Sequence, residues 1–433
     1  MPTLDESVAI GGHEVTNRLY RAPLLECAGN GPDAVDRLVA ELEPTAAAGA
    51  GLLFQGATVV RGEGGCAAPG MTRVHDDAFV SRLSRLTDRI HDHGASIFLQ
   101  LEHGGLRSME TWHAGYRDAN PDLRQLAVSR PPWQLRSLDR LGFLSLSPRV
   151  LSADDVRELA ADFGRAAARA VDAGYDGIHL AGANMGIIQQ FLSPFYNHRT
   201  DAFGGSRSKR VWFLELVHDE IRARAGDVPL VTKVPAETAA PRVVRRHLDV
   251  DDAVAIARSL ADIGFDGLVP VRTSTFWDMS IVRGKYPERA WTHERFQDGY
   301  ADAFGSRRRA RAVSLLNRLQ AHRFPTEPGW NADLCRRVRG AVDVPVLMEG
   351  GLRERAHIDS LLGDACDLAG MARPFYAEPR LPARLLGTEK ATAICESCNN
   401  CTVPQVTGAD GVCRTPAVLE RRGELERQGA YEE

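Results

Sequence analysis

Four of the eight cysteines in this 433-residue chain lie close together near its end. Cys395, Cys398, Cys401 and Cys413 follow the spacing C-x2-C-x2-C-x11-C. Three closely spaced thiolates and a fourth that returns after a short loop can surround a 4Fe–4S cluster, whereas structural zinc sites more often use two separated cysteine pairs. The spacing therefore favours an iron–sulfur cluster as the metal centre, with a zinc ion as the alternative.

A second group of residues suited to chemistry lies at the ends of two short apolar segments, 345–351 and 368–374. The first segment ends in Gly350 and Gly351, and the second contains Ala372 and Arg373. Glycine lets backbone N–H groups approach an anion, and an arginine adds a charge-assisted hydrogen bond. At two consecutive strand ends, these residues favour a phosphate-bearing cofactor over simple turns.

The elements that must position these residues alternate between strand and helix. Eight short apolar runs typical of buried parallel strands occur at 17–24, 51–60, 96–102, 176–180, 230–236, 267–273, 345–351 and 368–374. Helices are expected at 33–48, 77–93, 152–173, 206–225 and 251–263, and Ser152 with Asp155 forms a capping-box pattern. The alternation predicts an α/β fold, a (β/α)8 barrel. An open doubly wound sheet would carry G-x-G-x-x-G after its first strand, and none is present.

The chain is expected to divide into a barrel over residues 1–385 and a short cluster-binding segment over 386–433. Two connections, 103–151 and 274–330, are too long for plain strand–helix loops and are typical of lids or disordered segments. The arginine run at 307–311 is expected to be a solvated helix face.

Composition excludes several classes of function. The net charge of −4 without a basic tract argues against a role in nucleic-acid binding. No stretch approaches the roughly 18 unbroken apolar residues of a membrane span. The start, MPTLDESVAI, lacks the basic and apolar regions of a signal peptide, so we expect a cytoplasmic protein. In a reducing cytoplasm, clustered cysteines indicate metal ligation rather than disulfides.

The run QQFLSPFYNHRTDAFGGS at 189–206 follows a short strand and lies in a polar, aromatic-rich loop. It resembles the fourth-strand signature of the Old Yellow Enzyme family of flavin-dependent barrels. The resemblance is greatest to the branch that contains trimethylamine dehydrogenase and 2,4-dienoyl-CoA reductase, in which a similar cysteine motif binds a 4Fe–4S cluster after the barrel. It spans nearly the whole chain and implies flavin mononucleotide (FMN) as the phosphate-bearing cofactor.

The resemblance also implies which residues bind the flavin. Gln100 stands where a glutamine hydrogen-bonds the pyrimidine end of the ring. Lys233 takes the place of a basic residue, usually arginine, whose charge stabilises the anionic reduced flavin; the less favoured alternative is that Lys233 pairs with a buried carboxylate. The cofactor-binding residues that we expect are Ala22, Pro23, Leu24, Ala57, Gln100, Lys233, Gly350, Gly351, Ala372 and Arg373.

The residues expected to contact substrate depart from the family pattern. The family's substrate-binding pair falls at Ala181 and Asn184, of which only Asn184 can form a hydrogen bond through its side chain, and a frequent tyrosine is replaced by Gly186. Asp278 resembles the acidic member of a Trp-Asp pair in the amine-dehydrogenase branch, here Trp277-Asp278. It could take a proton from substrate or cap a helix. Asn184 and Asp278 are therefore the expected catalytic residues.

These features predict an FMN- and 4Fe–4S-dependent oxidoreductase that acts on a small organic substrate by hydride transfer at flavin N5. The leading hypothesis is substrate oxidation, with electrons leaving through the cluster to an external carrier such as an electron-transfer flavoprotein, ferredoxin or NAD(P)H. One alternative is an ene-reductase that draws electrons from NAD(P)H or ferredoxin. Another is a non-catalytic electron-transfer subunit, because the substrate-binding pair is incomplete. Assembly into a homo-oligomer is compatible with each of these.

Overall fold

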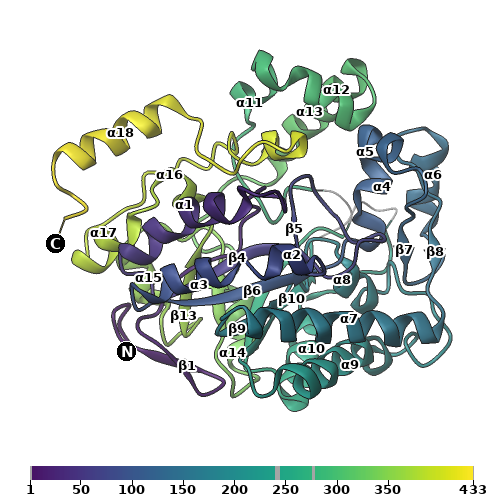
Figure 1. Cartoon of the computed structure of the whole chain (residues 1–433), viewed down its shortest axis with the longest axis horizontal. Helices are drawn as coiled ribbons and strands as arrows, with labels where there is room; N and C mark the ends of the chain where they lie inside the picture. The colour runs from purple at the N-terminus through teal and green to yellow at the C-terminus, as the bar shows by residue number, and fades with distance from the viewer. Residues whose placement is uncertain (1, 239–243, 276–277, 433) are drawn as a thin grey trace.

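The computed structural model describes residues 2–238, 244–275 and 278–432 (Figure 1). Its main sheet contains nine parallel strands, of which eight follow the order β11-β10-β9-β6-β4-β3-β13-β12. The ninth, β5 (Thr72–Arg73), pairs with β4 outside this order. The eight barrel strands are β3 (Leu19–Arg21), β4 (Leu52–Val59), β6 (Ser96–Glu102), β9 (Gly177–Leu180), β10 (Leu230–Glu237), β11 (Gly267–Thr273), β12 (Leu347–Glu349) and β13 (Leu368–Met371). A parallel bridge between Leu268 and Val346 joins the two ends of the sheet. The predicted (β/α)8 barrel is thereby confirmed.

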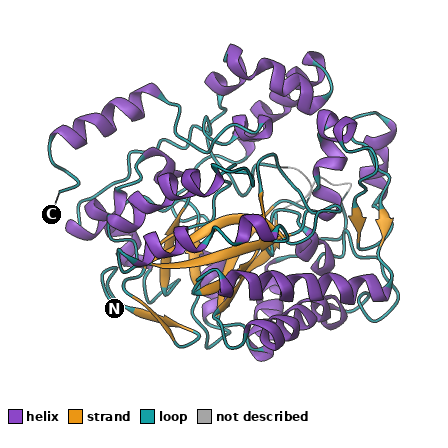
Figure 2. Ribbon diagram, viewed as in Figure 1, coloured by secondary structure: helices purple, strands orange, loops and turns teal. Residues whose placement is uncertain are grey.

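Helices surround the strands (Figure 2). They include α1 (Ala34–Ala47), α7 (Ala153–Asp172), α9 (Arg207–Ala225), α10 (Val250–Ile263), α14 (Ala332–Arg339), α15 (Arg355–Leu361), α16 (Arg373–Ala377) and α17 (Leu381–Gly387). The predicted capping box of α7 is confirmed, because the Ser152 and Asp155 side chains each accept a hydrogen bond from the other residue's backbone N–H. Helix α17 runs across residue 385, where the barrel was expected to end.

The helix expected at 77–93 is divided into α2 (Asp77–Val80) and α3 (Ser84–His91). Between them, the amides of Arg82 and Leu83 donate to the carbonyls of Phe79 and Val80, three residues earlier. Hydrogen bonds of this kind tighten the backbone into a turn and interrupt the α-helical repeat.

The barrel interior is apolar at its amino-terminal end. The strands β1 (Val8–Ile10) and β2 (His13–Val15) form an antiparallel hairpin there. Ile10 and Val15 are fully buried and pack in one cluster with Tyr20, Phe54 and Phe98 from the barrel strands. Burial of this apolar surface closes one end of the barrel and leaves the other end for a site.

The two long connections carry structure of their own. The first contains η1 (Gly105–Arg107), α4 (Met109–Trp112), α5 (Ala114–Ala119), β7 (Leu126–Ala127), α6 (Trp133–Arg140) and β8 (Arg149–Val150). The second contains α11 (Glu288–Thr292), η2 (Glu294–Phe296), α12 (Gln297–Phe304) and α13 (Arg307–Arg323). They lie at the same end of the molecule, where α12 contacts α5 (Figure 1). The four arginines of 307–311 are exposed on α13, as expected.

The segment after the barrel contains the clustered cysteines, η3 (Val403–Thr407) and α18 (Pro416–Arg427). Element η3 contacts α11 and α12, so this segment packs against the second long connection. Within the described ranges, no helix combines the length and apolar character needed to cross a bilayer.

Candidate active site

A cavity of about 850 Å³ opens at the carboxyl ends of the barrel strands. Lys233 contributes to it from within β10, and Thr273 and Glu349 contribute as the last residues of β11 and β12. Phe143 and Leu316 contribute from the two long connections. Its volume is within the roughly 300–1,000 Å³ typical of ligand and cofactor sites. Barrel enzymes place their active sites at this end of the strands, so the cavity is the candidate active site.

Most of the expected cofactor-binding residues line this cavity. They are Pro23, Leu24, Lys233, Gly350, Gly351, Ala372 and Arg373. Ala22, Ala57 and Gln100 do not line this cavity. Ala22 lies in the barrel core, and Ala57 packs against a separate apolar cluster around Met109.

Gln100 is bound within the barrel instead. Its Nε2 lies 2.9 Å from Nδ1 of His179, the residue beside it in the pairing of β6 with β9. Burial and the nearby charge of Lys233 lower the pKa of His179 well below its usual value and so favour the neutral imidazole. The side chain of Gln100 is thereby held by a neighbouring strand, and its predicted role at a flavin ring stays a prediction.

Lys233 forms an ion pair at the floor of the cavity. Its Nζ lies 2.6 Å from Oε2 of Glu349, and their side chains are only 6% and 14% exposed. The alternative predicted for Lys233, a buried carboxylate partner, is therefore present. The pair lines the cavity, so Lys233 remains placed to contact a ligand there.

The glycines after β12 adopt backbone conformations that other residues rarely take. Gly350 and Gly351 have φ angles of 108° and 76°. A β-carbon on Gly350 would lie 2.7 Å from the ring of Trp330, and one on Gly351 would lie 2.1 Å from the carbonyl oxygen of Glu327. Only glycine fits both positions, and the exposed backbone on the cavity side suits the approach of an anion.

Two arginines after β12 and β13 connect the cavity to the cysteine segment. Arg353 donates a hydrogen bond of 2.5 Å to the carbonyl of Cys395. Arg373 donates to Oδ1 of Asn399 and, at 2.8 Å, to the carbonyl of Arg283. Burial lowers the pKa of Arg373, and the nearby cysteines oppose this effect. The guanidinium expected to bind phosphate is thus directed toward the expected cluster ligands.

The four expected metal ligands border one small hollow, which they share with Arg373 and Tyr376. Burial raises the pKa of the Cys401 thiol to about 12, and the positive charge of Arg373 opposes the shift. Among the described residues, no group of three or more His, Cys, Asp and Glu side chains is arranged to hold a metal ion. The ligand set is gathered in one place, and its donor chemistry fits an iron–sulfur cluster.

A single apolar cluster separates the cavity from this hollow. It contains Leu24, Tyr376 and Cys401, with Ala372 packed against it. Leu24 and Ala372 line the cavity, whereas Tyr376 and Cys401 line the hollow. The Tyr376 hydroxyl donates to the carbonyl of Leu25 at 2.8 Å and fixes the two sides together. The two expected cofactor sites are therefore in van der Waals contact through this cluster.

Asn184 lines the cavity from the loop after β9. Its φ is 61°, in the left-handed region that asparagine tolerates better than most residues. Its backbone N–H donates to Oγ1 of Thr273 at 3.2 Å. Its side-chain Oδ1 is buried and has no hydrogen-bond partner among the described residues. A buried amide oxygen without a hydrogen-bond partner at a cavity wall is suited to a ligand contact.

Asp278 also lines the cavity, but its carboxylate is already engaged. Oδ1 accepts hydrogen bonds from Ser274 Oγ at 2.5 Å and from the Ser280 amide at 2.8 Å, and Oδ2 accepts from Thr238 Oγ1 at 2.9 Å. No helix begins at 278–287, so the predicted helix cap is wrong, and the Asp278 carboxylate instead links Thr238, Ser274 and Ser280. Trp277 lies outside the described residues.

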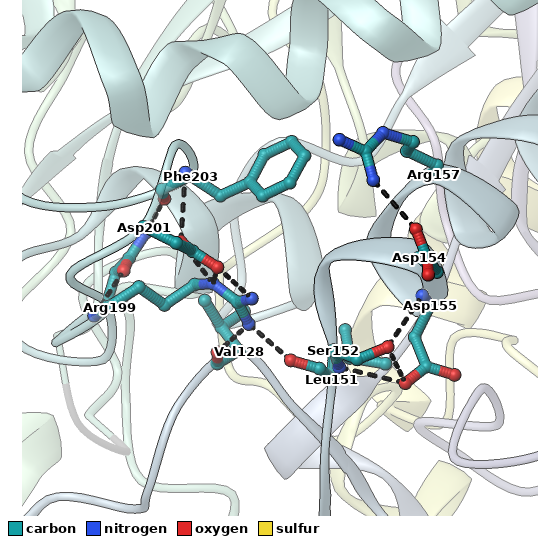
Figure 3. Close-up of polar contacts among 10 residues, drawn as sticks. Val128, Leu151, Ser152, Asp154, Asp155, Arg157, Arg199, Asp201 and Phe203 are labelled. Carbon is teal, nitrogen blue, oxygen red and sulfur yellow. Dashed lines mark hydrogen bonds and ion pairs between the residues drawn. The ribbon is translucent and has the colours of Figure 1, made fainter.

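The signature loop at 189–206 holds the walls of the site in place. Arg199 donates to the carbonyls of Val128 and Leu151 at 2.8 and 2.6 Å, and it pairs with Asp201 (Figure 3). Asp201 also accepts a hydrogen bond from the Phe203 amide. These contacts join the loop after β9 to the first long connection just before α7.

The same run begins in α8 (Ile187–Leu192), where Gln189 accepts a hydrogen bond from the amide of Met185 at 2.7 Å and donates one to Glu237 at 3.0 Å. Met185 shares the left-handed φ of Asn184, so this contact supports an uncommon backbone conformation. Burial raises the pKa of Glu237 to about 7. Gln189 and Arg199, both from the signature run, therefore position the site rather than line it.

Sequence reasoning missed one charged pair at the cavity. Arg107, in η1, lines the cavity, and its Nη1 lies 3.2 Å from Oε1 of Glu102 at the end of β6. Burial raises the pKa of Glu102. The signal available in the sequence was a glutamate at the carboxyl end of a strand whose other residues are apolar except Ser96 and Gln100.

Comparisons with known proteins agree with this arrangement. Residues 4–297 match the model of the NADH:flavin oxidoreductase / NADH oxidase family. The chain is 26% identical over 429 residues to the NADH oxidase of Thermoanaerobacter brockii, which covers 95% of this chain and 57% of that protein. It is 26% identical over 433 residues to the 4,4'-dithiodibutanoate disulfide reductase of Rhodococcus erythropolis, which covers 98% of both.

Among solved structures, histamine dehydrogenase from Rhizobium sp. 4-9 has the same fold, with a TM-score of 0.73 at 22% identity. The match covers 96% of this chain and 53% of that one, so this chain spans about half the length of the histamine dehydrogenase. The family model covers most of the barrel, and the signature loop predicted the same family. The chain belongs to the NADH:flavin oxidoreductase / NADH oxidase family, among the barrels that resemble Old Yellow Enzyme.

Proposed function

We propose that this chain is a cytoplasmic oxidoreductase that uses FMN and a 4Fe–4S cluster to act on a small organic substrate. The barrel, residues 1–385, would hold FMN, and residues 386–433 would hold the cluster. FMN supplies hydride exchange with substrate at its N5, and the cluster supplies one-electron transfer. The observation that carries the proposal is the packing of Leu24 and Ala372, at the cavity, against Tyr376 and Cys401, at the cysteine hollow.

The charges of the site fit these two anionic groups. Gly350 and Gly351 line the cavity at the end of β12, where their backbone could be approached by a phosphate. Arg353 and Arg373 lie between the cavity and the cysteines, so their positive charges offset thiolate charge as well. Lys233 supplies a cation at the cavity floor, held in place by Glu349.

The chain's own groups would also orient the substrate. Asn184 presents a side-chain amide whose oxygen is buried and has no hydrogen-bond partner in the described part of the chain. The apolar walls from the two long connections would exclude water from the reacting atoms. Asp278 would keep the loop after β11 in place, since its carboxylate accepts three hydrogen bonds from the protein.

Substrate oxidation, with electrons passed through the cluster to an electron-transfer flavoprotein or ferredoxin, is the direction that we propose. A second candidate is reduction of the substrate at the expense of NAD(P)H. One observation favours it: the relative matched over 98% of both chains is named as a disulfide reductase.

Anaerobic reduction of the purified holoenzyme tests both. The protein should contain about one FMN and, as a four-cysteine site of this kind requires, about four irons per chain. In the first candidate, neither NADH nor NADPH bleaches the flavin, whereas dithionite-reduced protein passes electrons to ferricenium only when the cluster is present. Rapid bleaching by NADH selects the second candidate. Protein that binds no FMN after reconstitution contradicts both.

A further inference from the structure

Arg107 differs from the other cations of the cavity in how little it is bound. Its side chain is 28% exposed, and its single hydrogen bond to a described residue joins Nη1 to Glu102 at 3.2 Å. The remaining N–H groups of the guanidinium donate to no residue in the described part of the chain. A guanidinium has five N–H donors in a fixed fork, so most of its binding capacity remains.

The other cations that line the cavity are more fully engaged. Lys233 pairs with Glu349 at 2.6 Å. Arg353 donates to both Cys395 and Ser397, and Arg373 donates to Asn399 and to a backbone carbonyl. Within the described ranges, Arg107 is therefore the lining cation with the most unused donors.

The ion pair leaves much of the Arg107 guanidinium unused. Glu102 is 6% exposed, and burial raises the pKa of its carboxyl, while the charges of Arg107 and Lys233 oppose this shift. The pair has one hydrogen bond rather than the two of a fork-to-fork contact. An incoming anion would thus meet a guanidinium with N–H donors still available.

Arg107 and Asn184 reach the cavity from neighbouring loops. Arg107 follows β6 and Asn184 follows β9, and these two strands are paired. A β-carbon on Gly186 would lie 3.5 Å from Oε1 of Glu102, so the loop that carries Asn184 passes beside the partner of Arg107. A guanidinium and a carboxamide on adjacent loops provide N–H donors that suit the two oxygens of a carboxylate.

The mouth of the cavity has the opposite character. Phe143 and Leu144 line it from the first long connection, and Val313 and Leu316 line it from α13. Phe143 is 51% exposed and Leu316 is 53% exposed. Large apolar side chains that remain exposed at the rim of a cavity mark a surface for an apolar ligand.

We propose that the substrate of this site is an apolar carboxylate, whose carboxylate group binds Arg107 and whose hydrocarbon part lies between Phe143 and Leu316. The inference rests on the proposed function, because it names the substrate class of the same flavin site. Arg107 would be a specificity-determining residue for this class.

Calorimetric titration of the holoenzyme with 4-phenylbutanoate and with its neutral counterpart, 4-phenylbutan-1-ol, tests the proposal. The wild type should bind the acid at least about tenfold more tightly, since a charge-assisted pair contributes that much or more. Arg107→Gln should weaken binding of the acid by about tenfold to a hundredfold and leave the alcohol unchanged. Arg107→Lys should retain part of the preference, and Leu316→Ala should weaken both probes by a similar factor.

Arg140→Gln is the matched control, because Arg140 is exposed on α6 and does not line the cavity. It should bind both probes as the wild type does. FMN and iron are measured on every sample, so loss of cofactor, which contradicts the proposed function, is distinguished from loss of carboxylate preference. Equal affinity for acid and alcohol in FMN-loaded wild type, no binding of the acid, or equal weakening of both probes in Arg107→Gln overturns the inference.

Discussion

Lys233 and Glu349 form an almost fully buried ion pair at the floor of the cavity, with 2.6 Å between Nζ and Oε2. The two residues come from β10 and β12, which are separated in the barrel by β11. Oε1 of Glu349 is buried and has no hydrogen-bond partner among the described residues. The negative charge of the Glu349 carboxylate is therefore compensated mainly by Lys233. The same lysine lines the cavity and can contact a ligand there. Mutation can separate its role in the ion pair from its role toward the ligand.

Lys233→Met should lower both stability and the flavin midpoint potential. Breaking a buried pair leaves Glu349 uncompensated, at a cost of about 3–5 kcal/mol. Loss of the cation also disfavours the reduced flavin as it gains negative charge. Chemical denaturation and spectroelectrochemistry measure the two effects. The double variant Lys233→Met/Glu349→Gln should recover stability but only part of the potential. An unchanged potential in FMN-loaded Lys233→Met would assign the lysine a structural role alone.

Cys413→Ser should remove the cluster while leaving FMN bound. The thiolates at 395, 398, 401 and 413 border one hollow, and a cubane cluster needs all four. We expect iron to fall from about four per chain to substoichiometric amounts, with loss of broad visible absorbance beyond that of the flavin. Cys27→Ala is the control, because Cys27 borders neither the cavity nor the hollow. If wild-type protein contains one zinc and no iron per chain, the four cysteines bind zinc, the alternative metal, rather than a cluster.

The barrel was predictable because its signals are local and repeated. Buried parallel strands are uniformly apolar, and the Ser152–Asp155 capping box marked the start of α7 correctly. Gly350 and Gly351 were also informative, since the positive φ angles and close neighbours of both positions admit no other residue. The split of 77–93 was not predictable, because both halves have helical spacing and the interruption depends on backbone hydrogen bonds at Arg82 and Leu83.

The parts of the site that sequence missed depend on pairings across the fold. Gln100 meets His179, which is 79 residues away, only because β6 and β9 pair in that register. The guanidinium of Arg373 turns toward Asn399 because the cysteine segment folds back against the barrel. A sequence pattern places a residue at a strand end, but it does not determine which of several neighbours the side chain contacts.

Stability should depend on pH through Glu237. Burial raises the pKa of Glu237 to about 7 from a usual value of 4.5, so the folded state retains a proton that the unfolded state releases. The stabilisation is therefore complete below about pH 4.5 and is lost as the pH rises to about 7, with a limit of about 3 kcal/mol for this shift. Between pH 5 and 7, the apparent Tm of the wild type should fall relative to that of Glu237→Gln. Above pH 7.5, the Tm curves of the two proteins should run parallel. Parallel Tm profiles across the whole range would contradict the shift.

Asn184→Ala should abolish most turnover while FMN and iron loading stay intact. The Asn184 side chain lines the cavity, and its buried amide oxygen has no hydrogen-bond partner in the described part of the chain. Removing one well-placed hydrogen-bonding group from an active site typically costs about 3 kcal/mol in the transition state, or about a hundredfold in rate.

Because Asn184 has a φ of 61°, alanine also strains the backbone. Asn184→Gly removes the side chain without that strain and should lose the same activity. Steady-state assays on a substrate found for the wild type check both variants. Full activity in Asn184→Gly with reduced activity in Asn184→Ala would assign the effect to the backbone rather than to the amide.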